Sequence, residues 1–524
     1  MHTQSKHHVG FGSCLALLAV LSACADDSSV PDTMQSVDAN ETALGSESPE
    51  LGAATAAEGS SIEESTEIVE PGTVDEVDAT NTTPGAEEPG DAELPMPQPA
   101  TEPPVNSQQF CALGALDAQS RVIPKIAKPE LLAPYLDPAF GSRVIRITGN
   151  DYGAVSKPVY STMQAWNADE SLLLLYNTGI NGAEHVLHDG QTYEFRQKLD
   201  IAPVDIEEIF WSHSEPDVLF YVSSRSAYYA QLIKYSISTD EKESLHDFSN
   251  YCGSDLPTNG GDVQMQSLDD DLFGFRCRDG DGHYNMLSYR VSTDEVTISP
   301  LGGGTGWSEW SAPIPAPSGD RFWFQGTTLA MDLFTMEQIL DMSNFYEHSN
   351  VGRTADGDDA LYQTSFSPSP NGCDGDDWHG VGHLVEHNLE SGKCRSIISQ
   401  AQGYPYTTSS THVSAQAYLA PSLVTVSSIG SDEQLTYFDN DTLAPALLSE
   451  VYLADTSKVT NHVCRLAHHR SFGKRAVNGG YAPYFGEPHA TISPTGTRII
   501  FGSDWYDSGS VDSYVIELPG YQRP

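Results

Sequence analysis

Short apolar runs alternate with clusters of turn-forming residues over most of the chain beyond residue 106. Such runs are Ser171–Tyr176, Asp217–Ser223, Arg321–Gln325, Leu423–Ser428 and Arg498–Ser503. Each follows a cluster rich in Asn, Ser, Pro, Asp or Gly, such as Ser493-Pro-Thr-Gly-Thr497 before the last run. Short apolar runs bounded by turn residues are typical of β-strands. The pattern therefore predicts an all-β fold.

The turn clusters recur at a spacing that suits one architecture. They lie near residues 167, 214, 269, 318, 367, 421 and 494, about 45 to 75 residues apart, which is close to one four-stranded propeller blade per interval. A β-sandwich would need two or more domains to use the 419 residues of 106–524, and no internal linker is visible. We therefore expect a seven-bladed β-propeller, with six or eight blades as alternatives.

One segment has a helical pattern instead. In Leu329–Ser343 apolar residues recur at intervals of three and four, which is the spacing of one face of a helix. We expect a short helix there.

The N-terminus has the pattern of an export signal. Lys6 precedes an apolar stretch from Cys14 to Leu21, which is shorter than the ~20 residues of a membrane-spanning helix. Leu21-Ser-Ala-Cys24 resembles the lipobox of bacterial lipoproteins, in which cleavage precedes the cysteine and a lipid is attached to its sulfur. We expect residues 1–23 to be a lipoprotein signal peptide and Cys24 to carry a lipid that anchors the exported protein to a bacterial outer membrane or cell surface. An ordinary secretory signal is the alternative.

Residues 24–105 differ sharply in composition from the rest. Twenty acidic residues and no Lys or Arg lie between Asp26 and Glu102, among Pro, Thr, Ser, Ala and Gly. Such a segment cannot bury enough apolar surface to offset its ordering entropy. We expect a disordered acidic linker between the anchor and a folded domain, 106–524.

The acidic excess extends into that folded domain. The chain has 73 acidic and 26 basic residues, of which 106–524 keeps 53 and 25, a net charge of -28. Phosphate binding needs a basic surface, so nucleic acid is excluded as the main partner. We interpret the charge as a solubility or salt adaptation, and we expect a monomer.

Six cysteines remain besides Cys14 and Cys24. An even number in an exported protein predicts disulfides, with fifteen possible pairings. Short loops favour Cys252–Cys277 and Cys373–Cys394, and Cys111–Cys464 would then tie the N-terminal segment to a late blade. No Cys-x-x-Cys spacing indicates a thiolate zinc site.

Histidines gather in the last third of the chain. Of seventeen, eight lie between His379 and His489, and several come just before a predicted strand. The innermost strands of propeller blades start at the same face, so residues at that position converge on the central channel. Converging imidazoles would form a site for Mn, Zn, Fe or Ni. For each histidine the alternative is a hydrogen-bonded structural residue.

A small set of side chains is the best candidate for metal ligands. The set is His412, His469 and His489, with Glu487 or His383 assisting. Neighbouring strand residues point to opposite faces, so only one of His468 and His469 can face the channel, and we choose His469. The expected cofactor is a divalent metal, Mn or Zn, with Ca as an alternative.

Five short motifs are spread over about residues 150–515. They are Gln164-Ala-Trp-Asn-Ala-Asp169, His188-Asp-Gly190, Thr411-His-Val-Ser414, Ala467-His-His-Arg-Ser471 and Glu487-Pro-His-Ala490. These motifs resemble the propeller polysaccharide lyases, a group that includes the oligogalacturonate lyases and the ulvan lyases. The Ser-Pro-x-Gly turn at Ser493 is more general, since it is similar to turns in many TolB-like propellers.

The resemblance implies a seven-bladed propeller and, in the oligogalacturonate lyases, a divalent metal, usually manganese, held by histidines and a glutamine. His412 and His489 sit where two of those ligands are expected. The family's Gln-x-x-His-x-His pattern is absent, and Gly486-Glu-Pro-His489 stands in its place. In the ulvan lyases the resemblance implies catalysis by histidine, tyrosine and arginine, and Tyr160 and His185 are the nearest matches.

The expected activity is that of a polysaccharide lyase, which cleaves a uronate-containing polysaccharide of ulvan or pectic type by β-elimination. The reaction removes the proton α to a carboxylate and expels the 4-O-linked sugar, so it needs a neutralised carboxylate and a base. We assign carboxylate binding to Arg470, the base to His379 or His185, and protonation of the leaving oxygen to Tyr160. The expected partner is an anionic polysaccharide or oligosaccharide.

Two other functions fit the same pattern. A non-catalytic, surface-anchored propeller that binds a glycan or a protein needs none of the histidines. A hydrolase or lactonase would use the same metal. A stoichiometric divalent ion in the purified protein distinguishes the enzymes from the binding protein.

Overall fold

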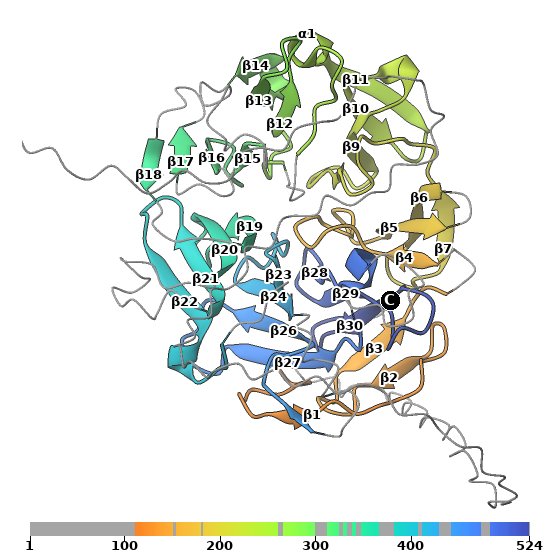
Figure 1. Cartoon of the computed structure of the whole chain (residues 1–524), viewed down its shortest axis with the longest axis vertical. Coiled ribbons are helices and arrows are strands. Elements are labelled where there is room, and N and C mark those ends of the chain that lie inside the picture. Colours follow the sequence, from red (N-terminus) through yellow and green to blue (C-terminus); the bar gives the residue numbers. More distant parts are fainter. Residues whose placement is uncertain are drawn as a thin grey trace, which may run out of the picture. The chain divides into compact units, whose positions relative to one another are not determined.

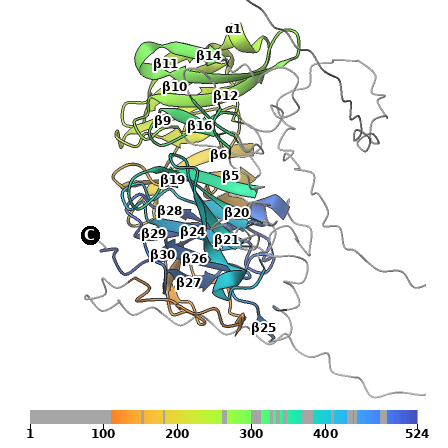
Figure 2. The ribbon, with the colours of Figure 1, turned by 90° about the vertical axis from the view of Figure 1, so that its left-hand side faces the viewer.

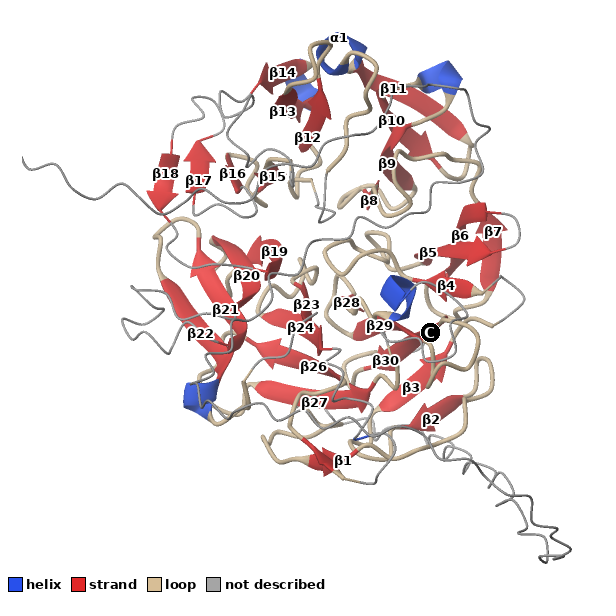
Figure 3. Ribbon diagram, viewed as in Figure 1, coloured by secondary structure: helices blue, strands red, loops and turns tan. Residues whose placement is uncertain are grey.

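The computed structural model describes residues 110–149, 154–179, 182–259, 266–298, 312–323, 329–332, 338–341, 347–365, 382–406, 411–428, 437, 442–472 and 483–522. All of them lie in one compact unit, Gly45–Pro524. The predicted signal peptide, Cys24 and the linker 24–105 fall outside the described residues. Within them strands dominate and helices are short (Figure 3), so the predicted all-β class is confirmed.

In the described residues, seven sheets of three to five antiparallel strands follow one another around a common centre and form the blades of a propeller (Figure 1). Blade 1 contains β4 (Val155–Lys157), β5 (Leu172–Gly179), β6 (Gly182–Asp189) and β7 (Phe195–Lys198). Blade 2 contains β8 (Ile209–Trp211), β9 (Val218–Ser223), β10 (Gln231–Ser236) and β11 (Glu241–Asp247). Blade 3 contains β12 (Leu272–Arg278), β13 (Tyr284–Arg290) and β14 (Glu295–Ile298).

The remaining blades come from the second half of the chain. Blade 4 contains β15 (Ile314–Pro315), β16 (Arg321–Trp323), β17 (Leu329–Asp332) and β18 (Gln338–Asp341). Blade 5 contains β19 (Glu347–Arg353), β20 (Asp359–Ser365), β21 (Gly382–Asn388) and β22 (Cys394–Ser399). Blade 6 contains β23 (Thr411–Ser414), β24 (Leu423–Ser428), β26 (Glu450–Asp455) and β27 (Val463–His468).

Blade 7 joins the two ends of the folded region. Its inner strands are β28 (Thr491–Ile492), β29 (Arg498–Ser503) and β30 (Asp512–Glu517), and its outer strands are β3 (Arg143–Arg146) and β2 (Pro134–Leu136). β3 pairs with β30 in the register Arg143↔Glu517, and the side chains of these two residues form an ion pair. The ring is therefore closed by strands that are more than three hundred residues apart in sequence.

Short elements lie between and beside the blades. A two-stranded ribbon is formed by β1 (Arg121–Val122) and β25 (Leu443–Ala444). The helices in the described residues are α1 (Ser249–Cys252), η2 (Ser226–Tyr228), η3 (Val291–Thr293), η5 (Gln400–Gln402) and η6 (Pro483–Gly486). None of the helices in the described ranges has the length and apolar content needed to cross a lipid bilayer.

The predicted helix at Leu329–Ser343 is wrong. The segment contains two strands, β17 and β18, which pair antiparallel with Leu329 opposite Asp341. β17 also pairs with β16, with Ala330 opposite Trp323. Pairing with a neighbouring strand thus outweighs a local apolar spacing that fits a helix, a common outcome for short segments.

Three of the seven turn clusters that predicted the blades share one hydrogen-bond pattern. The side-chain oxygens of Asn167, Ser267 and Ser493 each accept a bond from the backbone N–H five residues later, at 2.9, 2.9 and 3.3 Å. Asn, Ser and Asp favour such turns because their side chains replace a missing backbone partner. This local chemistry explains why the blade spacing is visible in the sequence.

Apolar side chains between neighbouring blades form the core. One cluster joins blades 1 to 3 and includes Trp211, Phe220 and Phe273. Another joins blades 6 and 7 and includes Val451 and Phe501. Figure 2 shows the strands of blades 2 and 3 at one end and those of blades 6 and 7 at the other. Each such side chain contributes about 1.5–3 kcal/mol when fully buried.

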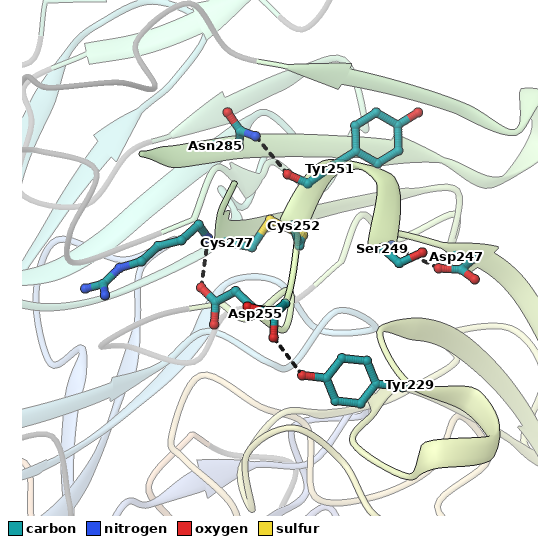
Figure 4. Close-up of a disulfide and its surroundings, with 10 residues drawn as sticks. Tyr229, Asp247, Ser249, Tyr251, Cys252, Asp255, Cys277 and Asn285 are labelled. Carbon is teal, nitrogen blue, oxygen red and sulfur yellow. Dashed lines mark hydrogen bonds between the residues drawn. A yellow bond between two sulfur atoms is a disulfide. The ribbon is translucent and has the colours of Figure 1, made fainter. Parts of the chain in front are cut away.

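Two of the three predicted disulfides are confirmed. Cys252 in α1 is bonded to Cys277 in β12, and nearby Asn285 donates a hydrogen bond to the Tyr251 carbonyl at 2.9 Å (Figure 4). Cys111 is bonded to Cys464 in β27, which ties the N-terminal segment to blade 6. Cys394 is also disulfide-bonded, but Cys373, its predicted partner, lies outside the described residues.

Candidate metal and active site

Four blades bring polar side chains together at their first strands. β4 ends at Lys157, β19 carries His348, β23 carries His412, and Glu487 and His489 come just before β28. These strands begin blades 1, 5, 6 and 7, and the first strand of a propeller blade lies nearest the central channel.

His412, Glu487 and His489 form a buried group that can hold a metal ion. Their ligand atoms all lie within 4.8 Å of one another, and the three residues are at most 3% exposed. The Nε2 atoms of His412 and His489 lie 3.4 and 3.3 Å from the same oxygen, Oε2 of Glu487. Ligand atoms held at about 2.1 Å by one tetrahedral ion stand about 3.4 Å apart. The spacing and the two-nitrogen, one-oxygen donor set therefore fit a divalent transition metal such as Mn or Zn.

The backbone around His489 is arranged to aim its side chain. His489 has a φ of 42°, in the left-handed region, which a residue other than glycine adopts at a cost of roughly 1 kcal/mol. Neighbouring hydrogen bonds hold this conformation: Gly502 donates to the Pro488 carbonyl at 2.8 Å and Ala490 to Ser427 Oγ at 3.2 Å. Backbone strain that is maintained by surrounding bonds is typical of functional sites.

Tyr160 and His348 lie directly beside this group. The Tyr160 hydroxyl is 3.1 Å from Nδ1 of His348. The Tyr160 ring contacts the rings of His489 and His412, with centroids 4.8 and 5.5 Å apart, and the His348 ring lies 4.7 Å from that of His412. A phenol and an imidazole in hydrogen-bond contact can exchange a proton.

Lys157 contacts His489 and Glu487 of the same group. Its Nζ is 2.8 Å from Nδ1 of His489 and 3.0 Å from the Glu487 carbonyl oxygen, and it stands 5.4 Å from the centroid of the Tyr484 ring. Behind it, Glu207 accepts hydrogen bonds from the hydroxyls of Tyr484 and Tyr176, at 2.6 and 3.2 Å.

Burial shifts the pKa values of these groups. It lowers the pKa of Lys157 to about 8, and it raises that of Glu207 to about 7 although the charge of Lys157 acts in the opposite direction. Burial, and then the charges of Lys157, His412 and His348, hold the pKa of His489 well below its ordinary value. His489 is therefore neutral at physiological pH, which is the form that binds metals.

The structure brings together three of the five side chains predicted as ligands, namely His412, Glu487 and His489. It leaves His469 out, contrary to our expectation. Nε2 of His469 bonds to the Ser428 carbonyl at 3.0 Å, and Nδ1 accepts a bond from the Ser471 N–H at 2.9 Å. Both ring nitrogens are thus occupied by the backbone. The fifth residue, His383, begins β21, and its side chain lies outside the described part.

The predicted catalytic residues are scattered, apart from Tyr160. Nε2 of His185 lies 2.6 Å from the Ile206 carbonyl, and burial lowers the pKa of His185 to about 4. Arg470 is buried, donates to Asp137 at 2.9 Å and stacks over Trp505. Neither residue contacts the His412 group among the described interactions. His379 lies outside the described residues.

Sequence reasoning missed Lys157 and His348. Lys157 lies in the short strand Val155-Ser-Lys157, which has no distinctive pattern, and lysine is seldom fully buried, so its place at the site could not be recognised. His348 precedes a run without clear alternation, Ser349-Asn-Val-Gly-Arg353, so its strand could not be recognised.

The fold and the site together define a β-propeller with a candidate divalent-metal centre near its inner strands. The chain is similar to an oligogalacturonate lyase in complex with manganese, with a TM-score of 0.50 and 18% identity over 77% of this chain and 99% of that one. It is also similar to an oligogalacturonate lyase from Vibrio parahaemolyticus, with a TM-score of 0.52 and 13% identity over 74% and 96% of the two chains. The predicted resemblance to propeller lyases is thus confirmed at the level of the fold. No protein-family model and no curated protein matches the chain.

Proposed function

We propose that this protein is a polysaccharide lyase that cleaves a uronate-containing polysaccharide, of ulvan or pectic type, by β-elimination. The observation that supports the proposal most strongly is the buried His412–Glu487–His489 group, at the inner strands of a fold shared with a manganese-bound oligogalacturonate lyase. In the reaction the C5–H and C4–O bonds break, a C4–C5 double bond forms, and the leaving sugar takes up a proton.

The three residues of this group would hold a divalent cation. Such an ion, when bound, would neutralise the charge that builds up on the uronate carboxylate. His412 and His489 offer neutral nitrogens, and Glu487 offers one negative oxygen. A cation held by only these three ligand atoms would keep coordination positions open for the substrate.

Tyr160 and His348 are the groups that we assign to proton transfer. The Tyr160 hydroxyl lies 3.1 Å from Nδ1 of His348, and its ring packs on both histidines of the group. A proton can therefore pass between the two side chains beside the bound sugar, as the base step and the protonation of the leaving oxygen require. His379 stays a second candidate for the base.

The overall charge opposes binding of an anionic substrate only at long range. The net charge of -28 over 106–524 repels a polyanion at long range, but charges more than about 8 Å away are screened at physiological salt. Lys157, which lies 2.8 Å from His489, adds a positive charge to the group at short range.

A direct assay tests the proposal. The purified protein is incubated with ulvan, polygalacturonate, glucuronan and alginate, with and without Mn²⁺, and the ultraviolet absorbance of the unsaturated uronate is followed. We expect absorbance to rise with at least one substrate and to depend on the metal. No signal on any substrate from folded protein would refute the lyase assignment. The matched control is Glu487→Gln, which keeps the shape of the side chain but removes its negative charge.

The cellular location is part of the same proposal. We infer that Cys24 carries a lipid anchor and that the exported chain acts at a bacterial surface, based on Leu21-Ser-Ala-Cys24 after the apolar stretch. Replacing Cys24 with Ser should move the protein from the membrane fraction to the soluble fraction. Unchanged fractionation would refute the anchor.

A further inference from the structure

We propose that the positive charge of Lys157 weakens cation binding by the His412–Glu487–His489 group, so that the cation is exchangeable and not permanently held. This inference rests on the metal site of the proposed function. It adds a role for a residue that has no part in the reaction steps described above.

The first observation is where the lysine lies. Lys157 has a relative exposure of 0%, and its Nζ lies 2.8 Å from Nδ1 of His489 and 3.0 Å from the carbonyl oxygen of Glu487. Both hydrogen-bond contacts are thus made to residues of the ligand group.

The second observation is the chemical type of this partner. A histidine that binds a metal usually donates its other ring N–H to a carboxylate or a carbonyl, which makes the ring a better ligand. An ammonium group has three donors and no acceptor. At Nδ1 of His489 the usual acceptor is therefore replaced by a donor that bears a positive charge.

This reversal acts against a bound cation, because a positive charge a few ångströms from a divalent cation repels it and burial strengthens the repulsion. Nε2 of His489, which lies 3.3 Å from Glu487 Oε2, is the ring nitrogen that remains for the cation.

Within the described part of the chain, Lys157 makes its hydrogen-bond contacts to a ring nitrogen and a backbone carbonyl and not to a carboxylate. The charges of Glu207 and Glu487 act on it without such direct contact. Glu207 is held by the hydroxyls of Tyr484 and Tyr176, at 2.6 and 3.2 Å. Among the carboxylates that influence Lys157, Glu487 is itself a member of the ligand group.

A purely structural role for Lys157 makes the opposite prediction. If the lysine served only to hold His489 in its left-handed conformation, its removal would loosen the ligand and weaken metal binding. The sign of the change in affinity therefore separates the two roles.

The experiment measures Mn²⁺ affinity by calorimetric titration of the metal-depleted chain. We expect Lys157→Met, which keeps the length of the side chain without its charge, to bind Mn²⁺ about 10- to 100-fold more tightly than the unmutated protein. Lys157→Arg keeps the charge and should retain weak binding. Glu487→Gln should lose binding, which shows that the titrated ion occupies this site.

Three results would overturn the proposal. Equal or weaker binding by Lys157→Met in a folded protein refutes the role of Lys157 but leaves the metal site and the lyase assignment intact. No binding by any variant, including the unmutated chain, refutes the metal site and this inference together. If Lys157→Met does not fold, the unmutated protein decides: it should lose Mn²⁺ during gel filtration in metal-free buffer, and stoichiometric retention would refute the proposal.

Discussion

Two groups of buried histidines lie in blades 6 and 7, and they differ in what their ring nitrogens face. His412 and His489 point to a shared carboxylate oxygen, Oε2 of Glu487. In the neighbouring pair, His468 is the last residue of β27 and His469 follows it. All four histidines are at most 1% exposed, so burial does not distinguish the two groups.

The second group belongs to the scaffold. His469 is bonded to two backbone groups. His468 packs on Phe140, with ring centroids 4.9 Å apart, and lies 3.8 Å from Glu450, whose carboxylate binds Arg465. These residues join blade 6 to the N-terminal segment. The comparison shows that the partner atoms of a buried histidine, and not its burial, indicate whether it can bind a metal.

The largest expected effect separates the two groups by function. His412→Ala should abolish Mn²⁺ binding and lyase activity, because it removes one of three ligands, while the melting temperature changes little. Calorimetric titration and the absorbance assay measure the effect. Mn²⁺ affinity equal to that of the unmutated protein would place the metal elsewhere.

The next effect concerns the scaffold group. Arg465→Met should lower the free energy of unfolding by about 3–5 kcal/mol, because it leaves the carboxylate of Glu450 buried and unpaired. Arg465 Nε donates to Glu450 at 2.7 Å, and Nη1 donates to the Gln119 carbonyl at 2.6 Å. Denaturant unfolding measures the loss. The double variant Arg465→Met, Glu450→Leu is the control, and it should recover much of the stability; no recovery would contradict this explanation.

A smaller loss of stability is expected when His469, which the sequence predicted as a metal ligand, is replaced. His469→Ala should cost about 1–3 kcal/mol, since the Ser428 carbonyl and the Ser471 N–H lose their partners. Mn²⁺ affinity should stay the same. A large fall in affinity without a change in stability would restore His469 as a ligand.

The smallest effect is a pH dependence of stability. Burial lowers the pKa of His469 from 6.5 to about 4, so the unfolded chain binds more protons than the folded chain between these values. Stability should therefore fall as pH falls below 6.5, and His469 should account for about 1 kcal/mol between pH 7 and 5.5. The variant His469→Ala should lack this contribution to the pH dependence of the free energy of unfolding, which denaturant unfolding at several pH values measures. An identical slope in both proteins would contradict the assignment.

The fold could be predicted because its signals are local. The side chains of turn residues such as Asn167, Ser267 and Ser493 accept hydrogen bonds from backbone N–H groups five residues later. A blade that begins with such a turn can therefore be recognised from the turn residues in the sequence. The helix at Leu329–Ser343 was wrong because a neighbouring strand, β16, determines the conformation of that segment, and strand pairing is not visible in a local pattern.

The site could be predicted only in part, for the same reason. His412, Glu487 and His489 stand out as histidine-bearing motifs before predicted strands. The choice of His469 over His468 as a ligand was wrong, because the alternation of strand faces does not reveal that both ring nitrogens of His469 bond to backbone groups. Lys157 and His348 reach the site from blades 1 and 5, and their contact with the ligand group depends on the closed ring.

The pairing of β3 with β30 has a consequence for how the chain matures. In the seventh blade, residues 512–517 lie between β29 and β3. The propeller ring can therefore close only after these residues have been made. Closing it joins strands that are distant in sequence, which is entropically costly. A translation product that stops before Asp512 would leave the edges of two strands unpaired. Closure of the ring would then depend on the six residues of β30, Asp512–Glu517.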